Sequence, residues 1–135
     1  MDCDDWNADS PGKEERMYKS DDWLRFVFGL SMLAEPGSRT AYCTGGVELL
    51  GGVLAQASGG PVPEFAAQRL FTPLQITDVQ WAPAAPDGTD TGGHLQLRPR
   101  DLLKIGQLMV DEGRWGGEQL VPSAWIADAT RSRVH

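Results

Sequence analysis

The run TGGVELLGGVLAQAS, residues 44–58, constrains the fold more than any other stretch of this chain. Its apolar residues recur at helical spacing, as Val47, Leu50, Leu54 and Ala57, with Leu49 and Val53 beside them. This pattern predicts a helix with one apolar stripe, capped by Thr44 and ended by Ser58-Gly59-Gly60. The glycine pairs at 45–46 and 51–52 weaken such a helix by about 1 kcal/mol per residue relative to alanine, so we expect another backbone to pack close to them.

Short helices and long loops are expected on both sides of this run. Helix starts are indicated at Ser20-Asp21-Asp22, Pro63, Pro99 and Pro122, and the alternation at residues 94–97 indicates a short strand. We therefore predict a mainly α fold of several short helices with long loops and at most a short strand pair. Residues 1–135 are expected to form a single domain, with an acidic irregular arm (1–19), a helical part (20–81), an exposed, mobile loop (82–93) and a second helical part (94–135).

The acidic balance of the chain restricts its partners. The formal net charge is −7, and residues 1–22 carry eight acidic and three basic side chains. This sign argues against nucleic acid and against an anionic membrane surface. The N-terminus is polar and lacks the basic start and apolar centre of a signal peptide, so the chain as written is expected to stay in the cytoplasm, with a solvated, loosely held arm.

Two cysteines, Cys3 and Cys43, offer no zinc-ligand spacing. They could form a disulfide if the arm folds back in an oxidising compartment, but free buried thiols are favoured. The acidic side chains of the arm could bind a cation, but no glycine-pivoted calcium loop with a closing glutamate follows them. They are Asp2, Asp4, Asp5 and Asp9. No metal and no cofactor is therefore predicted.

A nucleophile is hard to find in the sequence. The segment Ser10-Pro11-Gly12-Lys13 is a literal Ser-x-x-Lys match, in which the lysine would accept the serine proton on one helix face. Pro-Gly inside the motif opposes that helix, so we interpret the match as chance. No Gly-x-Ser-x-Gly motif is present. His94 has no acid or serine partner suggested by spacing and is expected to be structural, and His135 is expected to be frayed.

Tyr42 remains as a candidate for proton transfer. A phenol has an ordinary pKa of about 10 and acts as a base at neutral pH only where nearby cations lower that value. Taken without further context, Tyr42 is expected to be a packed aromatic side chain at the entry to the helix.

Five sequence phrases, taken in their order along the chain, favour a proton-transfer role for Tyr42 over a packing role. Glu35-Pro36-Gly37 and Tyr42-Cys43-Thr44 precede the helical run. Three phrases follow along the chain: Leu70-Phe71-Thr72-Pro73-Leu74-Gln75-Ile76, the segment 92–106 with Gly92-Gly93-His94-Leu95 and Arg100-Asp101-Leu102, and the segment 113–121 with Gly113-Arg114-Trp115-Gly116-Gly117. Together they resemble the serine β-lactamase and penicillin-binding-protein family, most closely the class C enzymes and related esterases. The resemblance covers nearly all of the chain and implies that the chain corresponds to the helical lobe of that fold.

The resemblance implies acyl transfer through an acyl-enzyme, in which Tyr42 would transfer protons. Thr44 would contact the substrate in place of the asparagine that is usual in the family, and this favours an ester or a peptide amide over a typical β-lactam because a hydroxyl has one donor where an amide has two. The family's Ser-x-x-Lys helix and Lys-Thr-Gly-like strand have no counterpart in residues 1–135. The chain is therefore expected to be inactive alone. Members of the family are often periplasmic or secreted.

Two alternatives to an inherited hydrolase piece stay open. One is a stand-alone module that binds a small-molecule ester or amide, or a protein, in the half-cleft around Tyr42. The other is a self-associating structural domain. A helical lobe without its sheet would expose apolar helix faces, and such faces tend to be covered by a partner, so a homodimer is expected.

Overall fold

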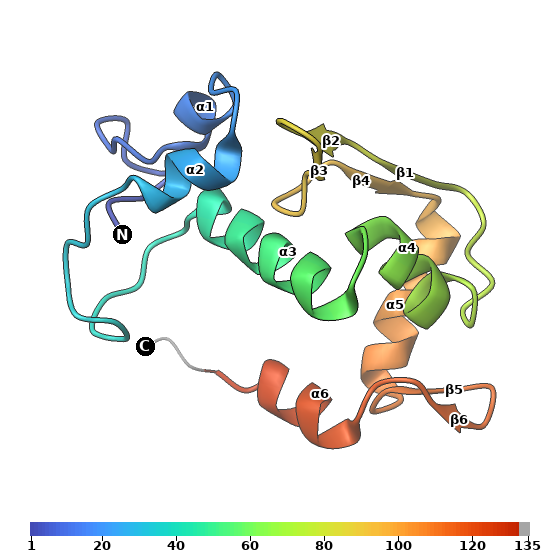
Figure 1. Cartoon of the computed structure of the whole chain (residues 1–135). Helices are drawn as coiled ribbons and strands as arrows, with labels where there is room; N and C mark the ends of the chain where they lie inside the picture. Colours follow the sequence, from blue (N-terminus) through green and yellow to red (C-terminus); the bar gives the residue numbers. More distant parts are fainter. Residues whose placement is uncertain (133–135) are drawn as a thin grey trace. The chain divides into compact units, whose positions relative to one another are not determined.

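The computed structural model describes residues 1–132, so that His135 lies outside the described residues (Figure 1). The chain divides into two compact units, each built from two stretches of sequence. Unit 1 comprises Met1–Val62 and Trp81–Leu95, and unit 2 comprises Pro63–Gln80 and Gln96–His135. The mainly α architecture with short strand pairs that the sequence predicts is confirmed.

Unit 1 holds the longest helix of the described residues together with short helices and a two-residue ladder. Its helices are α1 (Glu14–Met17), α2 (Trp23–Phe28) and α3 (Thr44–Ser58). Strands β2 (Pro83–Ala84) and β3 (Gly88–Thr89) pair antiparallel, with Pro83 opposite Thr89 and Ala84 opposite Gly88. Strand β1 (Val79–Trp81) pairs with β4 (Leu95–Leu97), and of these strands only Trp81 and Leu95 belong to unit 1.

The core of unit 1 lies where α1 and α2 meet the N-terminal end of α3 (Figure 1). Met17, Trp23, Val27 and Ala84 form the buried cluster, and Leu49 of α3 packs against it. The Asp22 carboxylate caps α2 by accepting a hydrogen bond from the Arg25 backbone N–H at 2.9 Å, which confirms the predicted helix start.

The face of α3 that is buried differs from the predicted apolar stripe. Thr44, Gly45, Glu48 and Gly51 are the buried residues of the helix, whereas Leu50 is 67% exposed and Val53 is 65% exposed. The apolar stripe is thus largely on the exposed side of the helix, in line with the expectation that a lobe of this kind exposes apolar helix faces. Gly45 and Gly51 have no side chain, so Val27 and Thr91 can approach the helix closely on this side. This close packing, rather than the apolar stripe, determines which side of α3 is buried. Thr44 is the first helical residue, and Cys43 occupies the cap position in its place.

Two glycines of α3 explain this choice of face. A Cβ atom added to Gly45 would lie 2.7 Å from Val27 Cγ2, and one added to Gly51 would lie 2.1 Å from Thr91 Oγ1. Neither position therefore tolerates a side chain without movement of its neighbour. The expectation that another backbone packs close to the glycine pairs is wrong, because side chains make the close approach at Gly45 and Gly51.

In unit 2, one helix precedes a short hairpin and another helix follows it. After α4 (Val62–Ala66) and the π-helical turn η1 (Ala67–Phe71), the chain forms α5 (Pro99–Val110), β5 (Arg114–Trp115), β6 (Glu118–Gln119) and α6 (Ser123–Ala129). Helix α5 starts at Pro99 and is followed by Gly113 at φ 84°, as its sequence predicts. Phe71, Leu74, Ile76, Leu108 and Ile126 are buried.

Two segments that were expected to be loose are packed. In the acidic arm (1–19), Cys3, Ser10 and Met17 are each at most 3% exposed, and Glu14–Met17 forms α1. In the loop at 82–93, Asp90 is only 1% exposed. The arm is held by backbone hydrogen bonds from Asp2 N to Ser31 O and from Gly12 N to Asp2 O, which composition alone does not reveal. Within residues 1–132, no helix has the length and apolar character needed to cross a membrane.

The burial pattern generates a stability prediction. Replacing Met17, which is fully buried, by alanine should lower the free energy of unfolding by about 2–5 kcal/mol because a cavity is left in the core of unit 1. Leu50→Ala on the exposed stripe is the matched control and should change it by less than about 0.5 kcal/mol. Urea unfolding followed by circular dichroism measures both. A larger loss for Leu50→Ala than for Met17→Ala would contradict the burial described above.

Candidate functional site

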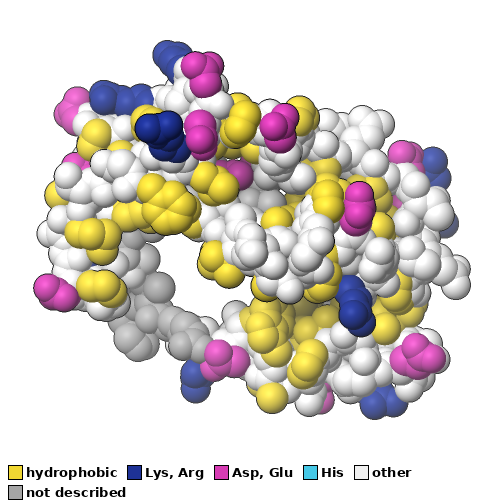
Figure 2. All heavy atoms as spheres, in the orientation of Figure 1, with side chains coloured by type: hydrophobic (Ala, Val, Ile, Leu, Met, Phe, Trp, Pro, Cys, Tyr) yellow, Lys and Arg dark blue, Asp and Glu magenta, His cyan; other side chains and the backbone are white. Residues whose placement is uncertain are grey.

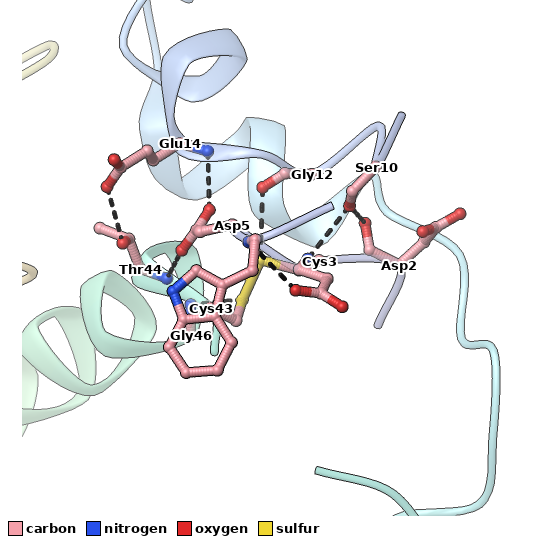
Figure 3. Close-up of a disulfide and its surroundings, with 11 residues drawn as sticks. Asp2, Cys3, Asp5, Ser10, Gly12, Glu14, Cys43, Thr44 and Gly46 are labelled. Atoms are coloured by element: carbon pink, nitrogen blue, oxygen red, sulfur yellow. Dashed lines mark hydrogen bonds between the residues drawn. A yellow bond between two sulfur atoms is a disulfide. The ribbon is translucent and has the colours of Figure 1, made fainter. Parts of the chain in front are cut away.

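The residues around the start of α3 are joined by one carboxylate (Figure 3). Asp5 Oδ1 accepts a hydrogen bond from the Glu14 backbone N–H at 2.8 Å, and Asp5 Oδ2 accepts one from the Thr44 backbone N–H at 2.6 Å. These two amides lie in the first turns of α1 and α3, where helix N–H groups have no partner within the helix. A negative charge at this position also interacts favourably with the helix dipoles.

A disulfide fixes the same region covalently. Cys3 and Cys43 are bonded, with 5.4 Å between their Cα atoms and 40 positions between them in sequence (Figure 3). The expectation of free thiols is therefore wrong. Sequence spacing could not decide the question because the bond depends on the arm folding back onto the entry to α3. Closing a loop of this length stabilises the folded state by about 4 kcal/mol in the chain-entropy treatment.

Tyr42 lies directly before this anchor point. Its backbone oxygen accepts a hydrogen bond from Asp5 N at 2.9 Å, while its side chain is 52% exposed. The ring stacks on Trp6, with 5.6 Å between ring centroids and 8° between planes. The phenol is thus presented at the surface with its ring orientation held by a second aromatic side chain. The proton-transfer role of Tyr42 stays a prediction.

Thr44 points into the interior of unit 1. It is 3% exposed, and its hydroxyl donates a hydrogen bond to Glu14 Oε2 at 2.9 Å. Its Cγ2 atom would lie 2.5 Å from a Cβ atom added to Gly92. The hydroxyl is therefore engaged in holding α1 to α3. The predicted contact of Thr44 with a substrate stays a prediction.

The Ser10 and Lys13 side chains are engaged separately. Ser10 is 2% exposed, and its hydroxyl donates to Asp2 O at 3.3 Å and accepts from Asp4 N at 3.1 Å. The Lys13 ammonium pairs instead with Glu15 at 3.2 Å. These contacts give Ser10 a structural role in the arm. Across residues 1–132, no cluster of three or more histidine, cysteine or acidic side chains is arranged to hold a metal ion.

Sequence reasoning missed a second polar cluster, which contains two buried carboxyl groups. Glu48 is 4% exposed and accepts a hydrogen bond from Gly92 N at 2.5 Å. Asp90 is 1% exposed, accepts from Gly93 N at 2.9 Å and pairs with His94 Nδ1 at 2.5 Å. His94 therefore has the acid partner that its sequence context did not suggest. The spacing of four between Asp90 and His94 was the available signal.

The ionisation of this cluster is set by burial. Burial raises the pKa of the Glu48 carboxyl, and the hydrogen bond that protonated Glu48 donates to Asp90 adds to the effect, whereas the hydrogen bond from the Gly92 backbone N–H opposes it. Burial also raises the pKa of the Tyr18 phenol, and the negative charges of Asp90 and Glu14 raise it further. Tyr18 is thus a neutral hydrogen-bonding group at physiological pH.

Comparison with known proteins identifies the class. The family profile described as Beta-lactamase matches residues 5–129, which is most of the chain, and the chain therefore belongs to the Beta-lactamase family. A search of curated proteins finds no match.

Comparison with solved structures agrees on the fold. A structure from Bacillus anthracis that is named as a 6-aminohexanoate-dimer hydrolase is similar to this chain, with a TM-score of 0.72 and 20% sequence identity. The match covers 90% of this chain and 30% of that one. The chain thus has part of a β-lactamase-like hydrolase fold and spans about a third of the length of this neighbour.

The bridging role of Asp5 generates a second prediction. Asp5→Ala should lower the free energy of unfolding by about 2 kcal/mol, because two helix starts each lose a cap that contributes about 0.5–2 kcal/mol. Asp5→Asn keeps one carbonyl acceptor and should lose less. The matched control is Asp9→Ala, which alters an exposed carboxylate of the same arm. Chemical unfolding of the three variants measures the order, and an Asp9→Ala loss equal to that of Asp5→Ala would refute the bridge.

Proposed function

We propose that this chain is the helical lobe of a serine hydrolase of the β-lactamase type, which in its complete form cleaves an ester or amide through an acyl-enzyme. The observation that carries the proposal is the position of Tyr42. It immediately precedes the cap of α3 in a chain of this family, and its side chain is 52% exposed beside Trp6. A phenol held in this way can donate or accept a proton at a surface that a substrate reaches.

The remaining catalytic groups would come from outside residues 1–135. Acyl transfer needs a nucleophile, a group that accepts its proton, and backbone donors for the oxyanion. The printed sequence contains no helical Ser-x-x-Lys and no Lys-Thr-Gly-like strand. Groups that act as a unit lose most of their effect when one of them is removed. We infer that residues 1–135 alone do not catalyse hydrolysis.

The substrate class follows from what surrounds Tyr42. The Thr44 hydroxyl is engaged with Glu14 and offers no second donor, unlike the asparagine that the family resemblance implies at this position. This favours esters or simple amides over penicillin-type substrates. The named activity of the Bacillus anthracis neighbour, hydrolysis of a 6-aminohexanoate dimer, is consistent with an amide.

A second candidate function is a small-molecule binding module. Unit 1 contains a largely apolar cavity of about 430 Å³, lined among others by Trp23, Leu24, Val62 and Ala84. A cavity of this size is within the range of small-ligand sites. It supports an apolar ester or amide as ligand.

The disulfide bears on location. Disulfides persist in oxidising compartments, so the Cys3–Cys43 bond favours a periplasmic or secreted protein over the cytoplasmic location expected from the N-terminal composition.

An activity assay tests the main proposal. Purified residues 1–135, mixed with a chromogenic cephalosporin or a p-nitrophenyl ester, should release product at the rate of buffer alone, and intact-mass analysis should find no acyl adduct. Tyr42→Phe should leave both results unchanged, and Ser10→Ala serves as the matched control for the literal Ser-x-x-Lys match. Turnover that disappears in Tyr42→Phe or Ser10→Ala would sink the inference that the lobe is inactive alone.

Self-association is the third candidate and has its own test. The exposed stripe of α3 and the 75% exposed Phe28 of α2 are apolar surface that a second copy would cover, as in a homodimer. Figure 2 shows hydrophobic side chains open to the surface on one face of the molecule. Sedimentation equilibrium of the wild-type chain should give a dimer that weakens at least tenfold in Leu50→Lys, whereas Leu102→Lys on α5 should not weaken it. A wild-type monomer at 100 times the working concentration would remove this candidate.

A further inference from the structure

The turn at residues 90–94, called here the 90–94 turn, lies against the N-terminal half of α3. The Thr91 hydroxyl donates to Val47 O at 3.3 Å, and the Gly92 N–H donates to Glu48 Oε1 at 2.5 Å. One side chain of α3, Glu48, therefore holds the backbone of the turn. Both partners belong to unit 1.

The 90–94 turn is tightly packed against α3 at Gly92. A Cβ atom added to Gly92 would lie 2.5 Å from Thr44 Cγ2 and 2.9 Å from Glu48 Oε1. The turn thus touches the residue with which α3 begins. A displacement of the turn would therefore change the packing around Thr44, which is two residues from Tyr42.

The groups that hold the turn are acidic and buried. Glu48 and Asp90 are 4% and 1% exposed, and two adjacent carboxylates in such surroundings cannot both be charged at low cost. The side chains that contact them are Thr91, whose hydroxyl donates to Glu48 Oε2 at 3.4 Å, and His94, which pairs with Asp90. The charges of both carboxylates, together with those of Glu14 and Asp5, also raise the pKa of the Tyr18 phenol. Within the described part of the chain, no lysine or arginine forms an ion pair with Glu48 or Asp90.

We propose that Glu48, Asp90 and His94 form a pH-controlled latch for the 90–94 turn. With one proton held between the two carboxyl groups, Glu48 and Asp90 lie side by side and the turn stays seated on α3. Loss of that proton leaves two buried negative charges with only a 60% exposed imidazole as counter-charge, and the turn is released. This inference does not rest on the proposed hydrolase function.

The direction of the pH effect follows from the burial of Glu48. Its folded-state pKa lies above the value of about 4.3 for an unfolded chain. The stabilisation by the latch is therefore fully present below that unfolded value and is lost as pH rises through the folded-state pKa. The closed state should weaken about tenfold for each unit of pH between the unfolded-state and the folded-state pKa, because opening releases one proton in that range, and it should show no further dependence above the folded-state pKa.

Amide hydrogen exchange tests the latch directly. In the wild-type chain, the protection factors of the Gly92 and Gly93 amides, corrected for the intrinsic effect of pH, should fall as pH rises from 5 to 8, with a total loss of tenfold for each unit by which the pKa of Glu48 is higher in the closed than in the open state. Glu48→Gln keeps an acceptor for the Gly92 N–H and adds an amide donor toward Asp90, so its protection should be independent of pH. Glu35→Gln, an exposed position in unit 1, is the matched control and should behave as the wild type.

A second variant keeps the test decisive if Glu48→Gln does not fold. Asp90→Asn removes the other carboxyl group and should also remove the pH dependence at Gly92. The ¹³C chemical shift of the Glu48 carboxyl in the wild-type chain should titrate at the same pH as the loss of protection. Protection at Gly92 that is constant from pH 5 to pH 8 in the wild type, or that still falls in both variants, would overturn the latch.

Discussion

The carboxylate of Asp5 is the interaction on which the organisation of unit 1 depends. It accepts from the first turns of α1 and α3, and its own backbone N–H donates to Tyr42 O, so the start of α1 and the entry to α3 are both held by one residue of the arm. The neighbouring disulfide restricts the same segments in the unfolded chain. Because α1 has only four residues, it could not persist without such an anchor. The position of Tyr42 is thus a consequence of how the acidic arm is tied down.

Helix positions were predictable from the sequence because local signals determine them. Pro99 and Gly113 frame α5, Asp22 caps α2, and the run at 44–58 forms α3 with the predicted bounds. Which face of α3 is buried was not predictable in this way. Hydrophobic periodicity assumes that apolar side chains turn inward, but the side that packs here is the one on which small residues allow close approach. That choice depends on Val27 and Thr91, which no local pattern connects to the helix.

The residues of the candidate site were likewise predictable where a local motif marks them and not predictable where they are brought together from distant parts of the sequence. Tyr42 could be singled out because a short motif and its following helix are adjacent in sequence. The pairing of Glu48 with the 90–94 turn joins residues more than 40 positions apart. An isolated glutamate in an apolar helix and an aspartate in a glycine-rich loop each have an ordinary explanation as solvated groups. The same limit applies to Cys3 and Cys43, whose bond depends on the path of the arm.

The exposed stripe and the buried polar face of α3 are two aspects of one arrangement. A helix that places Thr44 and Glu48 inward must satisfy their polar atoms, and Glu14 together with the 90–94 turn does so. The opposite, apolar face then lacks a cover within unit 1, as the exposure of Leu50 and Val53 shows. In α3 the buried polar side chains have hydrogen-bond partners, whereas the apolar side chains on the opposite side of the helix are exposed. The apolar side of α3 is therefore the surface on which the homodimer proposed above would make its contacts.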